Sequence, residues 1–486
     1  MAIDIAGNKA VGFRPNVIMI VIDALRARNL GCYGGEPGIS PWIDNIARQG
    51  LLFSKAYCTW NTTDPSLTTI LTGKYPISHG ITQHGDKVNE RHLDCLRLTG
   101  TRTIGQILKE HNYHTITVDW MKRWFKLGID DYGYIQDQGF VKKARQYLKY
   151  MANHREIFSL YMSKRAGFLP SLSDIKGTLG TFLFTRELAE LQDAAFVTAS
   201  AIKMIKRRKK SNFFALIHYW DTHTPYNSPK SFTREAPSGK KEALKGKYLG
   251  AVRYTDSQVG KLCDALKADG LLDNTLLIIT SDHGESLTEH DIYFDHHGLY
   301  EESIHVPLIM RYPRLFPDGK KIDAFVQHVD LLPMILDILG IDAHEHDLDG
   351  RNLMPLVDGT RRKIRPFVYS EESYVQRKMA IRTDRYKFIY PTDGMGHCRY
   401  CRKIHSAPVE LYDLSDDPRE TRNIAQENDG TSKALGEQLQ DFVSGLIIKR
   451  NARAAAGRNP GNVRETDCEA EEAEISRKLR SLGYHG

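Results

Sequence analysis

Short, continuous apolar runs recur along the chain and predict the strands of a buried sheet. Runs of this kind, rich in β-branched or aromatic residues, are typical of strands covered on both faces. Helical periodicity lies between them, at residues 41–49 and 103–110. Strands that alternate with helices predict an α/β fold, with a large mixed, mostly parallel β-sheet sandwiched by helices. The apolar runs are residues 16–22, 114–118, 213–219 and 276–280.

Acidic residues lie at the ends of three of these predicted strands. Asp23, Asp221 and Asp282 each come just after an apolar run. In parallel sheets the carboxyl ends of the strands share one edge, and ligands bind there. Three carboxylates at three strand ends therefore predict a polar site at this edge. Taken singly, each has an ordinary explanation, such as a helix N-cap for Asp23 or a turn at Asp282.

The alternation breaks between about residues 135 and 210. Basic segments with helical periodicity predict an inserted helical cap or lid there. The insert ends in a basic run at residues 206–210. This run is either the solvated end of a helix or a contact with a membrane or polyanion.

The last part of the chain has a different pattern of apolar and polar residues, with short alternating segments in place of long apolar runs. Three such segments predict antiparallel strands, and Asp384 with Arg385 suits a turn between the last two. We therefore predict a catalytic α/β domain over residues 1–365 and a smaller domain over residues 366–486. The smaller domain is expected to hold an antiparallel sheet and a C-terminal helix. The three segments are residues 366–370, 378–382 and 386–390.

Composition narrows the class of protein without naming a function. The chain has 486 residues, 41% hydrophobic and 26% charged, which is ordinary for a globular protein. A net charge of +7 over this length does not predict a nucleic-acid partner, although it suits an anionic substrate. No apolar run reaches the length of a membrane span, so integral membrane association is not expected. Seven cysteines without a disulfide framework, and a start without signal-peptide features, predict a cytoplasmic protein.

One segment carries a specific resemblance. Thr63-Asp64-Pro65-Ser66-Leu67, followed by an apolar run that ends in Leu-Thr-Gly, resembles the Cys-x-Pro-Ser-Arg signature of the sulfatases. Further segments resemble the same family in the same order along the chain. We therefore identify the chain as similar to the sulfatase-like part of the alkaline phosphatase superfamily. The further segments are residues 14–26, 30–34, 41–44, 279–285, 298–307, 410–418 and 482–484.

The resemblance implies a metal site and a nucleophile. Asp23, Asp282 and His283 match the metal-binding positions of the family, and Thr63 stands at its nucleophile position, as a fourth ligand. A hydroxyl is a poor nucleophile at neutral pH and needs a base or a metal to activate it. A mixed oxygen and nitrogen set favours Zn²⁺ or Mn²⁺, with Ca²⁺ or Mg²⁺ as alternatives.

A second set of residues is expected to face the transferred group. His223 resembles the substrate-facing histidine of the family, and His296 with His297 resembles its Lys-His pair. His223 and His297 are thus candidate catalytic residues. Asp221, His223 and His297 are also a candidate second metal site, the alternative being that these residues and His296 bind substrate oxygens. His218 is interpreted as a packed strand histidine.

Departures from the family pattern point to a changed reaction. Ala24 replaces a second acidic residue, Leu67 replaces an arginine, and Thr63 replaces the cysteine that sulfatases convert to formylglycine. Thr has no second hydroxyl to expel a sulfate group, so water must attack the covalent intermediate. We therefore predict a phosphodiesterase-like hydrolase of phosphate or phosphonate esters. The alternatives are a sulfuric ester hydrolase, a phospho-headgroup transferase and an inactive binding protein with the same fold; many relatives are homo-oligomers.

Cys398 and Cys401 form a Cys-x-x-Cys pair between two histidines. A zinc site and a plain reduced hairpin are both consistent with this spacing.

Overall fold

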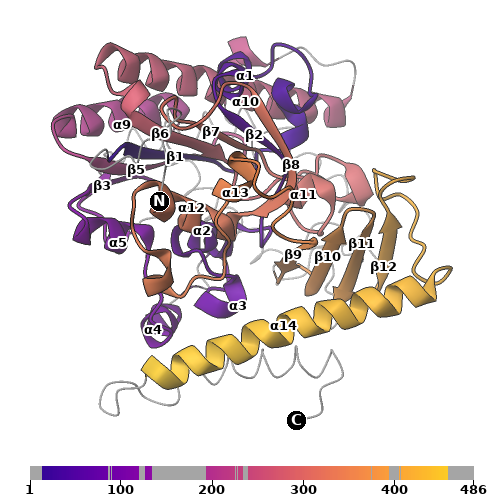
Figure 1. The fold of residues 1–486 in the computed structure, drawn as a ribbon. Helices are drawn as coiled ribbons and strands as arrows, with labels where there is room; N and C mark the ends of the chain where they lie inside the picture. The colour runs from indigo at the N-terminus through magenta and orange to yellow at the C-terminus, as the bar shows by residue number, and fades with distance from the viewer. Residues whose placement is uncertain are drawn as a thin grey trace, which may run out of the picture.

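The structure, a computed structural model, describes three stretches of the chain. They are residues 14–119, 126–133 and 193–457, except 86–87, 89, 225, 227, 234–238, 374, 393–403 and 405–406. Figure 1 shows a large sheet between layers of helices and a smaller sheet beside it. None of the helices in these stretches combines the length and apolar character that crossing a membrane requires.

The large sheet has eight strands, and most neighbouring strands are parallel. Only β7 runs antiparallel to its two neighbours, β6 and β2. This confirms the predicted mixed, mostly parallel sheet. In spatial order the strands are β4 (Asp131–Gly133), β3 (His114–Val118), β5 (Phe213–Tyr219), β1 (Asn16–Ile22), β6 (Thr275–Thr280), β7 (Leu308–Arg311), β2 (Leu51–Tyr57) and β8 (Lys320–Gln327).

The apolar runs become strands because both faces of the sheet are covered. Along β1, Val17, Met19 and Val21 join one hydrophobic core, while Ile18 and Ile20 join the other. The first core includes side chains of α2 (Thr63–Thr72), α5 (Ile104–Glu110) and α12 (Leu331–Ile338). The second includes side chains of α1 (Pro41–Arg48), α9 (Ala194–Arg208) and α10 (Lys240–Ala268).

The predicted helical insert is described only at its end. Residues 134–192 lie outside the described residues, so a cap or lid there stays a prediction. The end of the segment forms α9, which packs on β3 and β5 as part of the helical layer of the sheet. The apolar face of α9 therefore buries against the sheet, while the basic run extends from its C-terminal turn.

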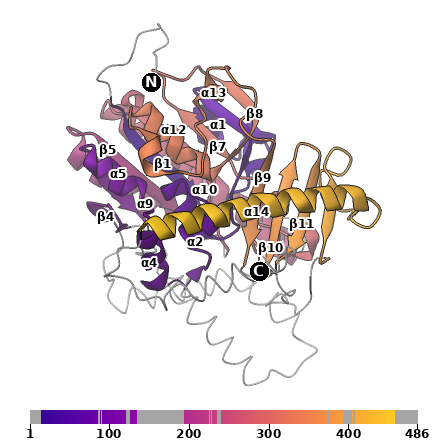
Figure 2. The same ribbon diagram turned by 60° about the horizontal axis from the view of Figure 1, so that its bottom comes forward.

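The small sheet confirms the predicted antiparallel strands and the turn at Asp384 and Arg385. Its helix α14 (Asp429–Gly457) packs on one face of the sheet through a core that includes Phe388, Leu439 and Val443. Figures 1 and 2 show α14 crossing the sheet and reaching α3 and α4 of the larger part. The strands are β9 (Phe367–Glu372), β10 (Lys378–Thr383), β11 (Tyr386–Pro391) and β12 (Glu410–Asp413).

Shorter helices complete the described part of the chain. The α-helices are α3 (Pro76–His79), α4 (Glu90–Leu98), α11 (Glu301–Ile304) and α13 (Met354–Val357). The 3-10 turns are η1 (Ala27–Asn29), η2 (Gly31–Tyr33), η5 (Lys230–Phe232), η6 (Leu272–Asn274), η7 (Glu289–Asp291), η8 (His328–Asp330) and η9 (Ala343–His346).

Candidate active site

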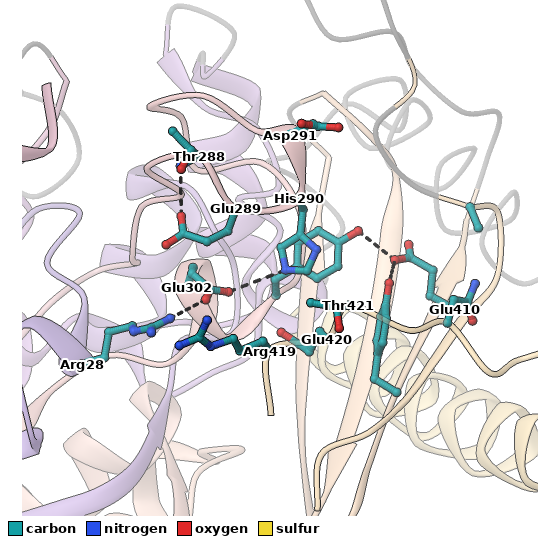
Figure 3. Close-up of a pocket in the computed structure, with 14 residues that line it drawn as sticks. Arg28, Thr288, Glu289, His290, Asp291, Glu302, Glu410, Arg419, Glu420 and Thr421 are labelled. Carbon is teal, nitrogen blue, oxygen red and sulfur yellow. Dashed lines mark hydrogen bonds and ion pairs between the residues drawn. The ribbon is translucent and has the colours of Figure 1, made fainter. Parts of the chain in front are cut away.

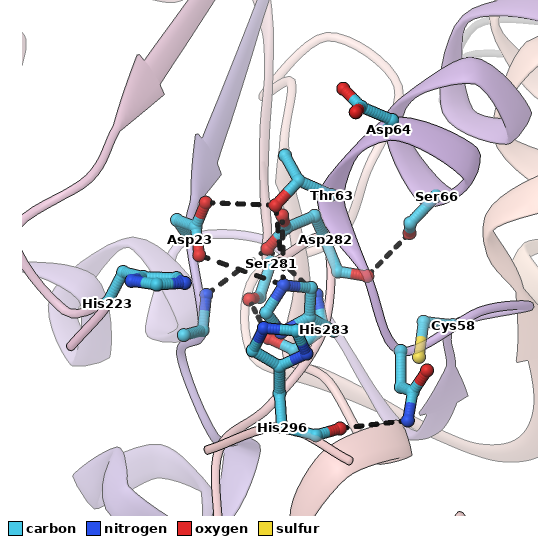
Figure 4. Close-up of polar contacts among 12 residues, drawn as sticks. Asp23, Cys58, Thr63, Asp64, Ser66, His223, Ser281, Asp282, His283 and His296 are labelled. Atoms are coloured by element: carbon cyan, nitrogen blue, oxygen red, sulfur yellow. Dashed lines mark hydrogen bonds and ion pairs between the residues drawn. The ribbon is translucent and has the colours of Figure 1, made fainter. Parts of the chain in front are cut away.

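Two neighbouring strands bring three predicted ligands together. Asp23 follows β1, and Asp282 and His283 follow β6, which pairs with β1 in parallel. One ligand atom from each of the three side chains lies within 4.8 Å of the others, and all three side chains are fully buried. Figure 4 shows them converging from the two strand ends. The predicted group is therefore assembled by strand order alone.

Thr63 lies against this group at the first residue of α2. Its Oγ1 is 3.3 Å from Asp23 Oδ2 and 3.5 Å from His283 Nε2. Thr62 precedes it in an extended conformation and leaves the first amides of the helix without a side-chain cap. A helix N-terminus carries a partial positive charge, which favours an anionic group beside Thr63.

Other residues of the Thr63 segment hold its position. Ser66 Oγ donates a hydrogen bond of 2.5 Å to the carbonyl of Asp282 and lies 3.1 Å from His328 Nδ1. Asp64 Oδ2 accepts a hydrogen bond of 2.7 Å from the Gly85 amide. Leu67 is buried in the hydrophobic core, so no cationic side chain enters from the position where the family has arginine.

The carboxylates of Asp23 and Asp282 do not have a hydrogen-bond donor for each of their oxygens in the described part of the chain. Asp23 Oδ1 and Asp282 Oδ2 are buried and have no hydrogen-bond partner among the described residues. Burial and the adjacent Asp23 raise the pKa of Asp282. Burial alone would also raise the pKa of Asp23, but His223, His218 and His283 bring it below its usual value. Unpaired buried carboxylates are costly, and a divalent cation between them would remove that cost. The donor set therefore fits a metal ion.

The sequence analysis missed a network behind Asp23. His218 is completely buried, with Nδ1 2.8 Å from Asp119 Oδ1 and Nε2 3.6 Å from Asp23 Oδ2. Burial would lower the pKa of His218, but the two carboxylates raise it to about 10. A cationic imidazole thus joins Asp23 to Asp119. The sequence held a signal for this network, because Asp119 directly follows β3 just as Asp23 directly follows β1.

Two of the predicted substrate-facing histidines, His223 and His296, lie beside the group of Asp23, Asp282 and His283. The His223 ring stacks on Trp220 with centroids 4.3 Å apart, and its Nδ1 is 2.6 Å from the carbonyl of Thr224. The His296 ring lies 4.4 Å from the His283 ring and 5.7 Å from the His223 ring. Burial lowers the pKa of both His223 and His296, which favours their neutral forms.

The remaining predicted residues are placed differently. Asp221 Oδ1 accepts a hydrogen bond of 3.2 Å from the Ala194 amide at the start of α9. The groups of three or more ligand atoms found among the described residues do not include Asp221, His223 or His297. His297 is buried, with Nδ1 3.5 Å from Asp295 Oδ2. The structure thus does not gather the predicted second metal set into one cluster. Cys398 and Cys401 lie outside the described residues.

Comparisons with known proteins match most of the chain. The sulfatase family model matches residues 15–341, and a model of the N-sulphoglucosamine sulphohydrolase C-terminal region matches residues 288–446. The chain is 24% identical to N-acetylglucosamine-6-O-sulfatase of Bacteroides thetaiotaomicron, covering 85% of this chain and 82% of the relative. It is 26% identical to human arylsulfatase A, covering 94% and 92%. The phosphonate monoester hydrolase of Agrobacterium radiobacter shares the fold with a TM-score of 0.63 and 19% identity, covering 90% and 96%.

Proposed function

The chain belongs to the sulfatase family of hydrolases, and we propose that it cleaves phosphate or phosphonate esters through a covalent intermediate on Thr63. The observation that carries this proposal is the position of the Thr63 hydroxyl. It lies at the N-terminus of α2 and 3.3 Å from a candidate metal ligand, Asp23. A cysteine at this position could become formylglycine, but a threonine hydroxyl must act as it is.

Asp23, Asp282 and His283 would hold a divalent ion, with Zn²⁺ or Mn²⁺ favoured by the mixed donor set. Such an ion lowers the pKa of an adjacent hydroxyl and withdraws charge from a transferred group. His223, His218 and His283 hold the pKa of the Asp23 carboxyl below its usual value, which favours its anionic form. Ser66 holds the loop that carries Asp282 against α2, so nucleophile and ligands keep their spacing.

In the first step Thr63 Oγ1 attacks the phosphorus atom, and the bond to the leaving oxygen breaks. The Thr63 hydroxyl loses its proton and the leaving oxygen gains one, and His223 is suited to carry the proton from the first to the second. Its Nδ1 donates to the Thr224 carbonyl, an assignment made from the 2.6 Å contact, so that Nε2 can take up and return a proton. In the second step water attacks the phosphothreonine, which releases the product and restores the hydroxyl.

The attack of water on the intermediate distinguishes phosphoryl from sulfuryl transfer. Formylglycine hydrate can expel its sulfate through a second hydroxyl, whereas Thr63 has none. A phosphothreonine can be resolved by water, so the single hydroxyl favours phosphorus esters.

The test compares wild type, Thr63→Ala and Thr63→Ser on three aryl esters. They are bis-p-nitrophenyl phosphate, p-nitrophenyl phenylphosphonate and p-nitrophenyl sulfate. We expect Thr63→Ala to lose turnover while it keeps its metal content, and Thr63→Ser to retain part of it. Acid quenching during turnover should leave a phosphate or phosphonate adduct on Thr63, detected by mass spectrometry. Full activity of Thr63→Ala would refute the covalent mechanism.

A second candidate function is sulfuric ester hydrolysis, which is favoured by the sulfatases among the relatives. The same panel separates the two. If the rate of sulfate release exceeds the rates on both phosphorus esters, this candidate replaces the first.

A further inference from the structure

A second group of buried acidic side chains lies behind the loop that carries Asp282 and His283. The backbone of Glu302 in α11 accepts a hydrogen bond of 3.1 Å from the Glu285 amide, just beyond that loop. The Glu302 side chain points the other way, into a cavity of about 690 Å³ between the large sheet and the small one (Figure 3). This junction lies outside the candidate active site.

Carboxylates are the commonest charged groups in the cavity wall. Its lining carries five carboxylates and two guanidinium groups. Two of the carboxylates, Glu410 and Glu420, are paired from beneath with Lys378 and Lys387. A third, Glu289, faces Arg26 at 2.8 Å, so the wall is close to neutral and the case for a cation rests on Glu302 and the residues beside it.

Three of the lining residues form a ligand group, which we call the junction group: His290, Glu302 and Glu420. One ligand atom from each lies within 4.8 Å of the others. His290 Nε2 is 3.8 Å from Glu302 Oε2, too far for a hydrogen bond. Two ligands of one metal ion, each about 2.1 Å from it, can be this far apart.

Glu302 supplies an independent sign of a missing ligand. Its side chain is only 4% exposed, and Oε2 has no hydrogen-bond partner among the described residues. The other oxygen, Oε1, lies 2.6 Å from Arg28 Nη1, whose side chain is 48% exposed. A buried carboxylate oxygen without a donor is destabilising, and a cation in the cavity would satisfy it.

His290 is held in a costly conformation that presents its ring to this oxygen. Its backbone φ is +53°, in the left-handed region that non-glycine residues rarely adopt. The ring stacks on Tyr300 with centroids 3.6 Å apart and planes at 7°.

Glu420 is also fixed in place. Its Oε2 accepts a hydrogen bond of 2.8 Å from the Glu301 amide, and its Oε1 lies 2.6 Å from Lys387 Nζ. The lysine offsets one charge of the junction group and should weaken its hold on a cation without abolishing it.

We propose that His290, Glu302 and Glu420 bind a divalent transition-metal cation at the junction of the two sheets. One imidazole and two carboxylates suit Mn²⁺ or Zn²⁺. The ion would join the loop at His290, the helix α11 and the segment at Glu420, which come from both parts of the chain. Its role is to stabilise the packing of the small sheet against the large one. The site does not depend on the proposed function of Thr63.

The test is a titration of the EDTA-stripped full-length protein with Mn²⁺, in which free Mn²⁺ is followed by electron paramagnetic resonance. Mn²⁺ is chosen because thiolates such as those of Cys398 and Cys401 bind it poorly. We expect His290→Asn and Glu302→Gln to bind one ion fewer than wild type. Asn tolerates the left-handed backbone, so the first variant should fold. Asp291→Asn, an acidic lining residue outside the junction group, is the matched control and should bind as wild type does.

Asp282→Asn separates this site from the candidate active site. It should lose the other ion and keep the junction ion, while the double variant with His290→Asn loses both. Mn²⁺ should raise the melting temperature of wild type and Asp282→Asn more than that of His290→Asn. If wild type and both junction variants bind equal numbers of ions, the junction site is refuted, whatever Asp282→Asn shows.

Discussion

The segment of residues 282–302 contributes to two buried clusters of carboxylates, and they are neutralised in different ways. At the candidate active site, Asp23 and Asp282 have no ion pair with a lysine or arginine in the described part of the chain; the cationic His218 is shared with Asp119. At the junction, the carboxylate of Glu302 faces Arg28, and that of Glu420 faces Lys387.

This difference separates the cluster that is proposed to serve catalysis from the cluster that is proposed to join the two sheets. Burial of an ion costs several kcal/mol unless opposite charge or good hydrogen bonds compensate it. The junction cluster obtains most of its compensation from the chain itself. The cluster at the candidate active site does not, so its burial destabilises the fold, and a bound cation would remove that destabilisation. A protein can keep such a cluster only when other parts of the fold are stable enough to hold it.

The largest expected effect comes from Asp282→Asn. The amide keeps Oδ1, which accepts hydrogen bonds from the Ala24 and His283 amides. It removes a charge needed for the ion, so turnover should fall by roughly three orders of magnitude or more. Without metal, the free energy of unfolding should stay constant or rise by about 1 kcal/mol, because an unpaired buried charge is gone.

Ester hydrolysis and urea unfolding in EDTA measure the two effects on Asp282→Asn. A large loss of stability without metal would show that the protein itself already neutralises the carboxylates of the candidate active site. That result would contradict the difference between the two clusters.

Lys387→Met tests the junction side of the comparison. Lys387 is fully buried, 2.9 Å from Glu301 and 2.6 Å from Glu420. Its removal leaves the buried Glu420 without its cation, whereas Glu301 is 20% exposed and keeps Arg382 at 3.5 Å. The free energy of unfolding should therefore fall by about 3–5 kcal/mol. Turnover per folded molecule should remain close to that of wild type.

Lys363→Met is the matched control for Lys387→Met, because the pair of Lys363 with Asp384 is exposed. It should change stability little. Equal effects of the two substitutions would mean that burial does not determine how much these ion pairs stabilise the fold.

His218→Gln is expected to have a smaller effect, confined to metal affinity. The charged imidazole orients Asp23 from behind, and loss of such a contact typically weakens metal binding by about 10–100-fold. Activity measured against Mn²⁺ concentration should shift to higher concentration and recover at saturation. His114→Gln, which breaks a histidine–carboxylate pair with Asp131 at the opposite, amino-terminal end of the strands, should not shift it. A loss of activity that saturating metal does not restore would assign His218 a role other than positioning Asp23.

Much of the fold followed from local pattern. The runs at 16–22, 114–118 and 213–219 coincide with β1, β3 and β5, because continuous apolar sequence demands cover on both faces. Strands such as β7 and β8 escaped prediction, since β7 is short and β8 begins with exposed charged residues. The C-terminal strands were predictable because alternation and a turn pair are local signals.

The place of the site was predictable because it depends on the strand ends. The side-chain contacts of its residues were not predictable. Asp23, Asp282 and His283 come together as expected, because β1 and β6 are parallel neighbours. Asp221 lies one residue further past β5 than Asp23 lies past β1, and its carboxylate accepts a hydrogen bond from the start of α9. The sequence does not show which helix packs beside each strand end.

By itself, then, the sequence determined the strands with continuous apolar runs, the acidic residues that follow them and the threonine at the nucleophile position. These depend on residue order and periodicity, which are local properties of the chain. Only the tertiary structure decided which residues complete the site. The bond from Ser66 to the Asp282 carbonyl, the contact of His218 with Asp119 and the junction group each join segments far apart in sequence. Such contacts depend on strand order and on how the two sheets pack, and no local pattern records either.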